Sequence, residues 1–442
     1  MNPIFILLAL GLVVVQFRVP RRFAFVPLLV AICHFQSVPV IQIGVSFSAL
    51  KLVIMGGVMR AWREQIFSRL TRTPLDVAVV VWAAWMLLSG FAHHPTDQNP
   101  FTIRLSVIFD FAGSYLCARL FLRSRDDYER FLKCLGVALI PLAIAVAVEK
   151  YGHLNIYSVI SGSDQNLAFR SGKVRAAGPF GHPILCGTFA AGVVILLVPL
   201  WRGSRKLLIG GVGACLVTIL CSGSSGPIMT MGSGMLGAAL WHWRRSVGRI
   251  RALVIAAFVS LHLIMQAPVW YLMARIDLAG GSTGWHRAEL ITTALNHLNE
   301  WWLVGTDYTR HWIPYGVPWS ANHIDITNEY ISMGVNGGLL LVFLFILILI
   351  RAFQLLGRGL RFLRRTKGPA EFTLWCVGAA LFAHCFTFIS VSYFDQNFAA
   401  LGLVLGTVPG LCLVTADARG TTPRHSVEES VPGKAGAPNV AP

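Results

Sequence analysis

Residues 329–350, EYISMGVNGGLLLVFLFILILI, decide the fold class of this chain. After Glu329 the segment carries no charged side chain. It is long enough to cross the roughly 30 Å hydrocarbon core of a bilayer as a helix of about 20 residues. A helix satisfies all of its backbone hydrogen bonds internally, which lipid requires of a spanning segment. The segment therefore predicts a transmembrane helix.

Working outward from this segment, similar apolar stretches recur along most of the chain. The first and third of them are short. We therefore predict an all-α polytopic membrane bundle of about 12–13 transmembrane helices, which occupies residues 1–414. The predicted spans are 3–17, 23–41, 44–59, 75–93, 103–122, 131–149, 183–201, 207–222, 226–243, 252–272, 329–350, 372–391 and 397–414.

The composition agrees with a membrane protein and argues against a nucleic-acid-binding protein. Of the 442 residues, 55% are hydrophobic and only 13% are charged, and the mean hydropathy is +0.63. A soluble chain carries roughly 25% charged residues. The net charge of +17 comes from short basic runs between apolar stretches. Such runs are topology determinants, so we expect no nucleic-acid partner.

The basic runs predict the orientation in the membrane. Most of the lysines and arginines fall in alternate connections, which the positive-inside rule places in the cytoplasm. The N-terminus is then outside, and two long loops, at about 150–182 and 273–328, also lie outside. We expect the polar tail at 415–442 to be a disordered cytoplasmic segment. Long polar loops on a bundle are where function usually lies.

The first long loop ends in a basic cluster before a predicted helix. Its residues 173–183 are KVRAAGPFGHP, so Arg170, Lys173 and Arg175 precede the helix start near Pro183. Cations beside the backbone N–H groups of a helix N-terminus form a natural phosphate site. The alternative is that these side chains only anchor the loop at the membrane interface.

The second long loop contains an amphipathic segment led by an arginine. Residues 284–298, GWHRAELITTALNHL, are followed by Trp301 and Trp302. Such a helix is expected to lie on the membrane surface with tryptophan at the interface. Arg287 could then bind a lipid phosphate, or pair with an acid such as Glu289 and only hold the loop.

The same loop closes with a group of polar residues, NHIDITNEY at 322–330. His323 is a candidate catalytic base, and Asp325 could orient a histidine or act as the base itself. The alternative is a capping cluster for the following helix. We find no metal-ligand spacing, and the nine cysteines are expected to be core residues rather than ligands or disulfides.

Two further features have both structural and functional interpretations. Asp110 lies within an apolar stretch, where a carboxylate is costly and is either functional or paired with a neighbouring helix. The run SGSSGP at 222–227 is similar to a phosphate-binding nest, but a tight outer turn between two helices explains it more simply.

Taken in order, these motifs resemble the O-antigen ligase and O-antigen polymerase superfamily of bacterial surface-polysaccharide assembly. The resemblance covers roughly residues 75–350. It rests on Arg175 before the Gly-Pro-Phe-Gly-His-Pro run, on the helix led by Arg287, and on the Asn-Glu-Tyr helix start at 328–330 with its later glycines. One position departs from the family, which usually has histidine where this chain has Thr327. This departure favours an exopolysaccharide-type branch.

The resemblance implies a membrane glycosyltransferase of the bacterial inner membrane with a periplasmic active site. Its donor would be a glycan carried on polyprenyl pyrophosphate. Arg175, with Arg170 and Lys173, would bind the pyrophosphate, and Arg287 would stabilise charge growing on it. His323 or Asp325 would activate the acceptor hydroxyl. The reaction needs no cofactor or metal, and membrane lipid and other polysaccharide-assembly proteins are the expected partners.

The resemblance favours a polymerase that extends exopolysaccharide or O-antigen repeats over a ligase that moves glycan to a lipid acceptor. A transporter or flippase of a lipid-linked substrate is the alternative from another class. Transporters tend to contain inverted repeats and polar midplane sites. The polar residues of this chain concentrate in the outer loops instead.

Overall fold

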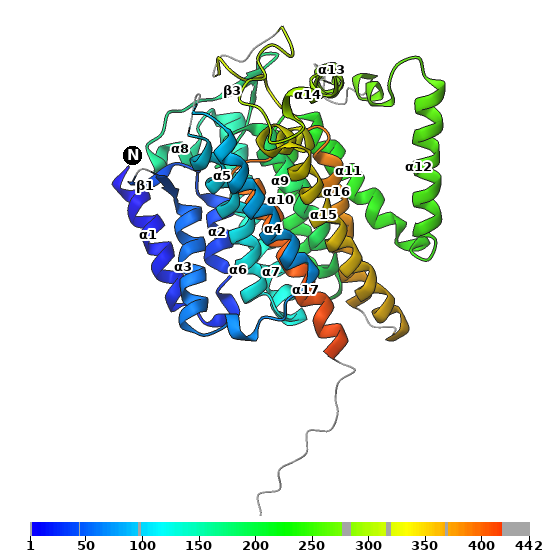
Figure 1. Ribbon diagram of the computed structural model, residues 1–442. Helices are drawn as coiled ribbons and strands as arrows, with labels where there is room; N and C mark the ends of the chain where they lie inside the picture. Colours follow the sequence, from blue (N-terminus) through cyan, green and yellow to red (C-terminus); the bar gives the residue numbers. More distant parts are fainter. Residues whose placement is uncertain are drawn as a thin grey trace, which may run out of the picture.

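The structure, a computed structural model, is a bundle of helices with two small hairpins (Figure 1). It describes residues 2–43, 45–95, 99–275, 284–314, 320–366 and 370–417. The helices are α1 Pro3–Arg18, α2 Val26–His34, α3 Ala49–Arg63, α4 Pro74–Ser89, α5 Pro100–Ile108, α6 Ser114–Phe121, α7 Arg125–Gly152, α8 Ile156–Ser161, α9 Pro183–Leu197, α10 Arg205–Cys221, α11 Ser225–Ala239, α12 Val247–Ile264, α13 Gly284–Asn296, α14 Leu298–Trp301, α15 Glu329–Thr366, α16 Ala370–Thr387 and α17 Gln396–Asp417. The strands are β1 Pro39–Ile43, β2 Val45–Ser48, β3 Ala168–Arg170 and β4 Lys173–Arg175.

The predicted all-α polytopic class is confirmed. Within the described residues, seven helical spans are long and apolar enough to cross a membrane. They are Pro74–Ala92, Pro100–Phe121, Arg125–Gly152, Pro183–Arg202, Val247–Ile264, Glu329–Arg365 and Ala370–Thr387. The span Pro100–Phe121 joins α5 to α6 through a π-helical turn at Phe109–Gly113. Shorter apolar helices at Pro3–Arg18 and Gln396–Cys412 accompany these spans.

Local sequence signals explain where two of the long helices begin. The Thr73 hydroxyl accepts the Asp76 N–H, and the Asp76 carboxylate accepts the Thr73 N–H. Ser124 and Asp127 form the same reciprocal pair at the start of α7. Each capping box satisfies backbone donors that would otherwise be free at the helix end.

The predicted helical spans 23–41 and 44–59 are wrong for residues 39–41 and 45–48. These residues form the antiparallel hairpin β1–β2, in which Ile41 pairs with Phe47 and Ile43 pairs with Val45. The chain carries β-branched residues at alternating positions there, and Pro39 lacks the N–H that a continuing helix needs. The apolar stretch 23–41 is therefore divided between the short helix α2 and a strand.

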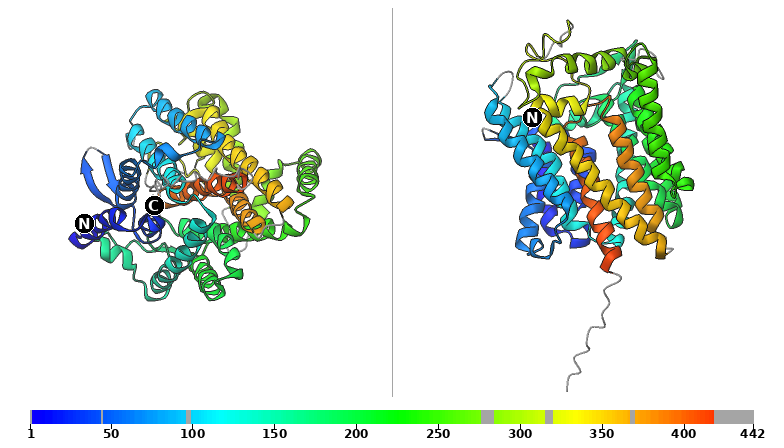
Figure 2. Two further views of the ribbon diagram at one scale, coloured as in Figure 1. Left: turned by 90° about the horizontal axis from the view of Figure 1, so that it is seen from below. Right: turned by 45° about the vertical axis from the view of Figure 1, so that its right-hand side comes forward.

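Helix α17 runs through the middle of the bundle, as the view from below shows (Figure 2). It packs against α6, α15 and α7, while α9 packs against α10, α11 and α16. One continuous apolar core includes side chains of all these helices, such as Phe111, Leu139, Phe345 and Val408. Seven of the nine cysteines are buried, as expected for core residues.

Two ion pairs cross the interior of the bundle. Lys51 Nζ of α3 lies 3.4 Å from Asp110 Oδ2, and both side chains are nearly inaccessible to solvent. Arg119 Nε of α6 lies 2.8 Å from Asp76 Oδ1 of α4. Asp110 thus has the structural partner that was one of its two interpretations, although its Oδ1 atom has no hydrogen bond within the described residues.

Helix α12 stands apart from the other helices (Figures 1 and 2). None of its residues is buried, although its hydropathy and length are those of a membrane span. A short 3₁₀ segment, Val269–Arg275, links its upper end toward α13. A fully exposed apolar helix is expected only where lipid or another helix surrounds it.

The N-terminus and both long loops lie at the same end of the bundle, and the lower end of α17 lies at the other (Figure 1). Of the tail predicted to be disordered, residues 415–417 belong to α17, and the remainder lies outside the described residues.

Candidate functional site

The hairpin β3–β4 presents the basic residues of the first long loop. Ser171 and Gly172 form its turn with positive φ values of 48° and 72°, which match the type I′ turn of tight hairpins. Arg170 pairs with Lys173, and Ala168 pairs with Arg175. Because alternate residues of a strand share a face, Arg170, Lys173 and Arg175 lie on one face of the hairpin.

Arg175 is held by the turn between α10 and α11. Its Nε donates to the Ser222 carbonyl at 3.3 Å, and its Nη2 donates to Ser224 Oγ at 2.5 Å. A Cβ atom added at Gly223 would lie 3.2 Å from Arg175 Cγ. The run 222–227 is therefore a helix–turn–helix connection between α10 and α11 that positions Arg175. The interpretation of this run as a turn is confirmed, and the turn also holds the Arg175 side chain in place.

The loop after Arg175 is anchored by a buried carboxylate. Glu149 of α7 is 1% exposed and accepts the N–H groups of Ala177 at 3.0 Å and Gly178 at 2.7 Å. Asn155 Nδ2 donates to the Gly178 carbonyl, and Gln396 Nε2 donates to that of Pro179. These contacts fix the loop between the arginine and α9.

His182 caps α9 at the end of this loop. Its Nδ1 accepts the Ile184 N–H at 3.2 Å. Desolvation by the surrounding chain, together with the positive charges of Arg175 and Arg170, lowers the pKa of His182 to about 4. The ring is therefore neutral at pH 7, which its role as an acceptor requires.

Arg287 points inward from α13. On this helix Arg287, Leu290 and Ala294 are buried, a spacing that places them on one helical face. Leu290 and Ala294 pack with Trp301 and Ile324 in a small separate apolar core. Arg287 is only 9% exposed, and within the described residues its Nε atom has no hydrogen-bond partner.

Charged residues of both long loops act on the pKa of Arg287. Burial and the positive charge of Arg170 lower the pKa of Arg287, whereas the carboxylate of Asp325 raises it. Burial and Arg170 also lower the pKa of Arg175. Arg170 thus acts on both other arginines, and an arginine stays charged at any physiological pH. These three arginines and Asp325 carry a net positive charge, which suits an anionic ligand.

Asp325 supplies a negative charge that acts on Arg287. Desolvation by the surrounding chain raises the pKa of Asp325, and the positive charges of His286 and Arg287 oppose the rise. The His286 ring also contacts the Asp325 carbonyl, with Nε2 at 3.4 Å. A carboxylate with a raised pKa beside cations is a reasonable general base.

His323 is held by a different part of the loop. Its Nδ1 lies 3.4 Å from Thr309 Oγ1, and its backbone N–H donates to Ser320 Oγ at 2.9 Å. Thr309 Oγ1 also accepts the Ile324 N–H, which fixes the chain between His323 and Asp325. The His323 ring thus contacts Thr309. The charges that act on Asp325 belong to His286 and Arg287 of α13.

The Asn-Glu-Tyr start of α15 is a structural anchor. Asn328 Oδ1 accepts the Ile331 N–H, and Asn328 Nδ2 donates to the Ile389 carbonyl. Glu329 is fully buried and accepts the Tyr393 N–H at 2.6 Å. Tyr330 donates to the Cys385 carbonyl at 3.1 Å. Asn328 therefore caps the start of α15, and the motif joins the second loop to the segment between α16 and α17.

The six residues singled out from the sequence thus divide into two groups. In the first group, the charge of Arg170 acts on Arg175 and Arg287, and that of Asp325 acts on Arg287. Lys173 shares the hairpin face with Arg170 but is exposed, and His323 is held by Thr309. Sequence reasoning missed Glu149, Ser224 and His286, because each acts through a contact between segments distant in the chain.

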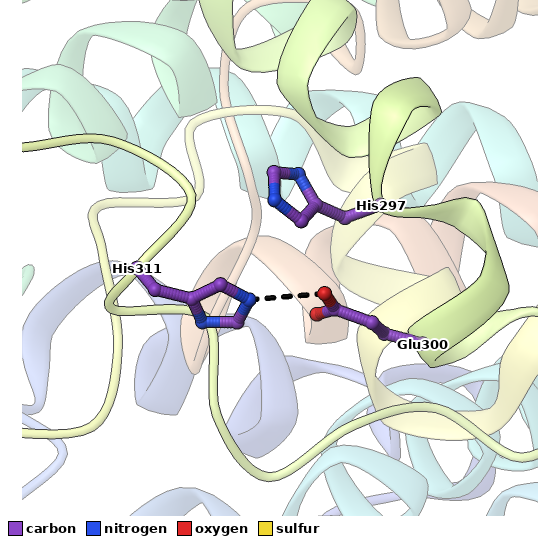
Figure 3. Close-up of side chains that lie close together, drawn as sticks. All are labelled: His297, Glu300 and His311. Carbon is purple, nitrogen blue, oxygen red and sulfur yellow. Dashed lines mark hydrogen bonds and ion pairs between the residues drawn. The ribbon is translucent and has the colours of Figure 1, made fainter.

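A second polar cluster was also missed, because its residues form no recognisable ligand spacing. His297, Glu300 and His311 bring one ligand atom each within 4.8 Å of one another (Figure 3). The first two belong to the α13–α14 region, and His311 belongs to the loop that follows.

Comparison with known proteins adds no assignment. No family model and no curated protein sequence matches this chain. The functional argument therefore rests on the residues themselves.

Proposed function

We propose that this chain is a membrane glycosyltransferase that uses a glycan linked to polyprenyl pyrophosphate at the outer face of a bacterial inner membrane. The observation that carries the proposal is the electrostatic group formed by Arg170, Arg175 and Arg287, in which Arg287 is nine-tenths buried and its Nε atom has no hydrogen-bond partner among the described residues. Burying a cation is costly unless a partner compensates for it. An anionic ligand would supply a partner for this cation.

A pyrophosphate suits this group in charge and geometry. It carries at least two negative charges, and guanidinium groups bind phosphate oxygens through paired N–H donors. The hairpin β3–β4 and helix α13, which carry the arginines, lie at one end of the bundle of apolar helices (Figure 1). This position suits a ligand whose charged head lies at the membrane surface and whose polyprenyl tail lies in lipid.

The proposed reaction uses Asp325 as the base. Its carboxylate takes the proton of an acceptor sugar hydroxyl, and the hydroxyl oxygen bonds to the anomeric carbon of the donor. The bond from that carbon to the pyrophosphate oxygen breaks, and the electron pair leaves with the phosphate. Arg287 and Arg175 stabilise the growing negative charge, an effect whose removal typically costs about 10²–10³-fold in rate. We favour Asp325 over His323 because the positive charge of Arg287 acts on the Asp325 carboxylate.

The proposal favours polymerisation of exopolysaccharide or O-antigen repeats, with ligation to a lipid acceptor as the alternative. The two differ in the product that accumulates when the gene is lost. A polymerase defect leaves single repeats on the lipid carrier. A ligase defect leaves long polymer on the carrier and a bare acceptor.

The test is complementation of a deletion strain at matched membrane abundance, with surface and secreted glycans separated on a gel. We expect Arg287→Ala and Asp325→Asn to abolish long polymer and Arg287→Lys to restore it only in part. His323→Ala distinguishes the two candidate bases. Arg275→Ala, at an exposed outer arginine, is the matched control and should retain wild-type glycan. Normal glycan in the Arg287 and Asp325 variants would refute the transferase and bring the transporter interpretation forward.

A further inference from the structure

The second polar cluster belongs to the second long loop, the same stretch of chain that carries His323 and Asp325. His297 ends the helical stretch that begins with α13, Glu300 belongs to α14, and His311 lies in the following loop. Figure 3 shows the His297 ring above the contact between His311 and Glu300. His311 Nε2 and Glu300 Oε1 are 3.0 Å apart. One ligand atom from each of the three residues falls within 4.8 Å of the other two.

The remaining polar atoms of two of these residues already have other partners. His297 Nδ1 lies 2.8 Å from the Thr293 carbonyl, so this nitrogen must carry the proton. The lone pair of its Nε2 is then available to a metal. Trp312 Nε1 donates to Glu300 Oε2 at 3.0 Å, which leaves Oε1 facing the histidines. Metal-binding sites commonly orient their ligands through such outer hydrogen bonds.

Aromatic stacking restricts the motion of both histidine rings. The His297 ring stacks on Trp312 with centroids 5.6 Å apart, and the His311 ring stacks on Tyr308 at 5.2 Å. An ion pair between His311 and Glu300 would explain only the positions of those two side chains. It does not explain why His297 directs a third potential ligand at the same point, with its other nitrogen bonded to a carbonyl.

We propose that His297, Glu300 and His311 bind a Zn²⁺ ion. Two imidazoles and one carboxylate are ligands that favour zinc over Mg²⁺ or Ca²⁺, which take oxygen ligands. Tetrahedral zinc with bonds of about 2.0–2.1 Å places its ligand atoms about 3.3 Å apart. The three atoms need only small side-chain rotations to reach that spacing. Glu300 and His311 are partly exposed, so water completes the fourth position.

The ion would join α14 to the loop that holds the candidate base. The N–H groups of Thr309 and Arg310, next to His311, donate to the Asn322 carbonyl at 2.9 and 3.0 Å. Thr309 Oγ1 also contacts His323 and Ile324. A bound metal therefore restrains the segment from Asn322 to Asp325. The metal site does not depend on the proposed reaction and holds for any activity of that segment.

The test uses the full chain, purified in detergent through a tag without histidine and stripped with a chelator. Zn²⁺ alone is titrated by calorimetry, and the bound metal is counted by mass spectrometry. We expect one saturable equivalent and a higher melting temperature with Zn²⁺, because a ligand that binds only the folded state stabilises it. His297→Ala, His311→Ala and Glu300→Gln should each lose this binding.

Three variants separate a metal site from loop packing. Glu300→Gln keeps an oxygen that can accept the Trp312 N–H, so it tests the charge with little change in packing. Trp312→Phe removes the outer donor while keeping an aromatic ring beside His297, and it should weaken binding by about 10- to 100-fold. His153→Asn changes a histidine at the left-handed C-cap of α7 and should bind as wild type. The absence of saturable binding, or binding unaffected by all three ligand substitutions, would overturn the proposal.

Discussion

Replacement of Glu149 by glutamine tests how the Arg175 loop is held in place. The carboxylate of Glu149 is buried and accepts two backbone N–H groups, from Ala177 and Gly178. Glutamine has nearly the same shape but only one acceptor oxygen. Its amide NH₂ group would therefore face a backbone N–H donor, and one buried donor would be left without a partner.

The expected cost follows from these two hydrogen bonds. A hydrogen bond to a charged group contributes about 1.5–3 kcal/mol, and a buried unsatisfied donor costs about 1–3 kcal/mol. One bond is lost in the variant and the other becomes a bond between neutral groups. We expect the loop closed by these bonds to be destabilised by about 2–3 kcal/mol. If the loop opens locally, amide exchange becomes about 25- to 150-fold faster at these two positions.

The assay is hydrogen–deuterium exchange of the purified protein, followed on a peptide that contains Ala177 and Gly178. The matched control is Glu129→Gln on the same helix, at an exposed glutamate that pairs with Lys133. An exposed pair of this kind contributes about 0–1 kcal/mol, so its exchange pattern should not change. Unchanged exchange in the Glu149 variant would refute the assignment of these hydrogen bonds as the anchor of the loop.

Three further predictions address the site and its support. If Asp325 is the base, transfer activity in membrane vesicles should rise with pH, and the midpoint of the rise should lie above 3.8, the ordinary pKa of an aspartate carboxyl. Arg287→Lys should keep this rise, and its persistence in Asp325→Asn would contradict the assignment. The folded pKa of His182, about 4, lies below its ordinary 6.5, so the unfolded chain binds more protons between these values and stability falls as pH decreases through that window; thermal unfolding should show a shallower fall for His182→Asn. Gly338 lies at a break in α15, where the backbone of Gly337 and Gly338 is not helical. Gly338→Ala should destabilise the protein by about 1–3 kcal/mol from backbone strain alone, since φ is 72° and the added Cβ would lie 2.3 Å from the Leu303 carbonyl oxygen. Gly357→Ala, in the regular helix after this break, has open space and should be neutral or stabilising in the same unfolding measurement.

The sequence was sufficient to predict the class of fold because membrane insertion depends on local properties. Length and hydropathy of a single segment, such as 329–350, decide whether it can cross a bilayer, whatever the rest of the chain does. The helix starts at Thr73 and Ser124 are local in the same way, because each cap lies three residues from its partner. Residues 39–48 were mispredicted because a short apolar run does not by itself distinguish a helix from a strand.

The basic residues of the first loop were partly predictable as well. Their sequence shows positive charge before a helix, and the hairpin with its Ser171-Gly172 turn then places Arg170, Lys173 and Arg175 on one face. The anchoring of Arg175 was not predictable, because Ser222 and Ser224 lie almost fifty residues away. Nothing local to either segment indicates that they meet.

What the sequence by itself determined is the membrane bundle and the two polar loops. Only the tertiary structure decided that Arg287 lies inward, where the charges of Asp325 and Arg170 act on it. Likewise, only the folded loop brings His297 and Glu300 to His311. The physical reason is the range of the interactions. Hydropathy and helix capping act within a few residues of the chain, whereas charge clusters and ligand sets depend on distances in space that helix packing and loop closure set.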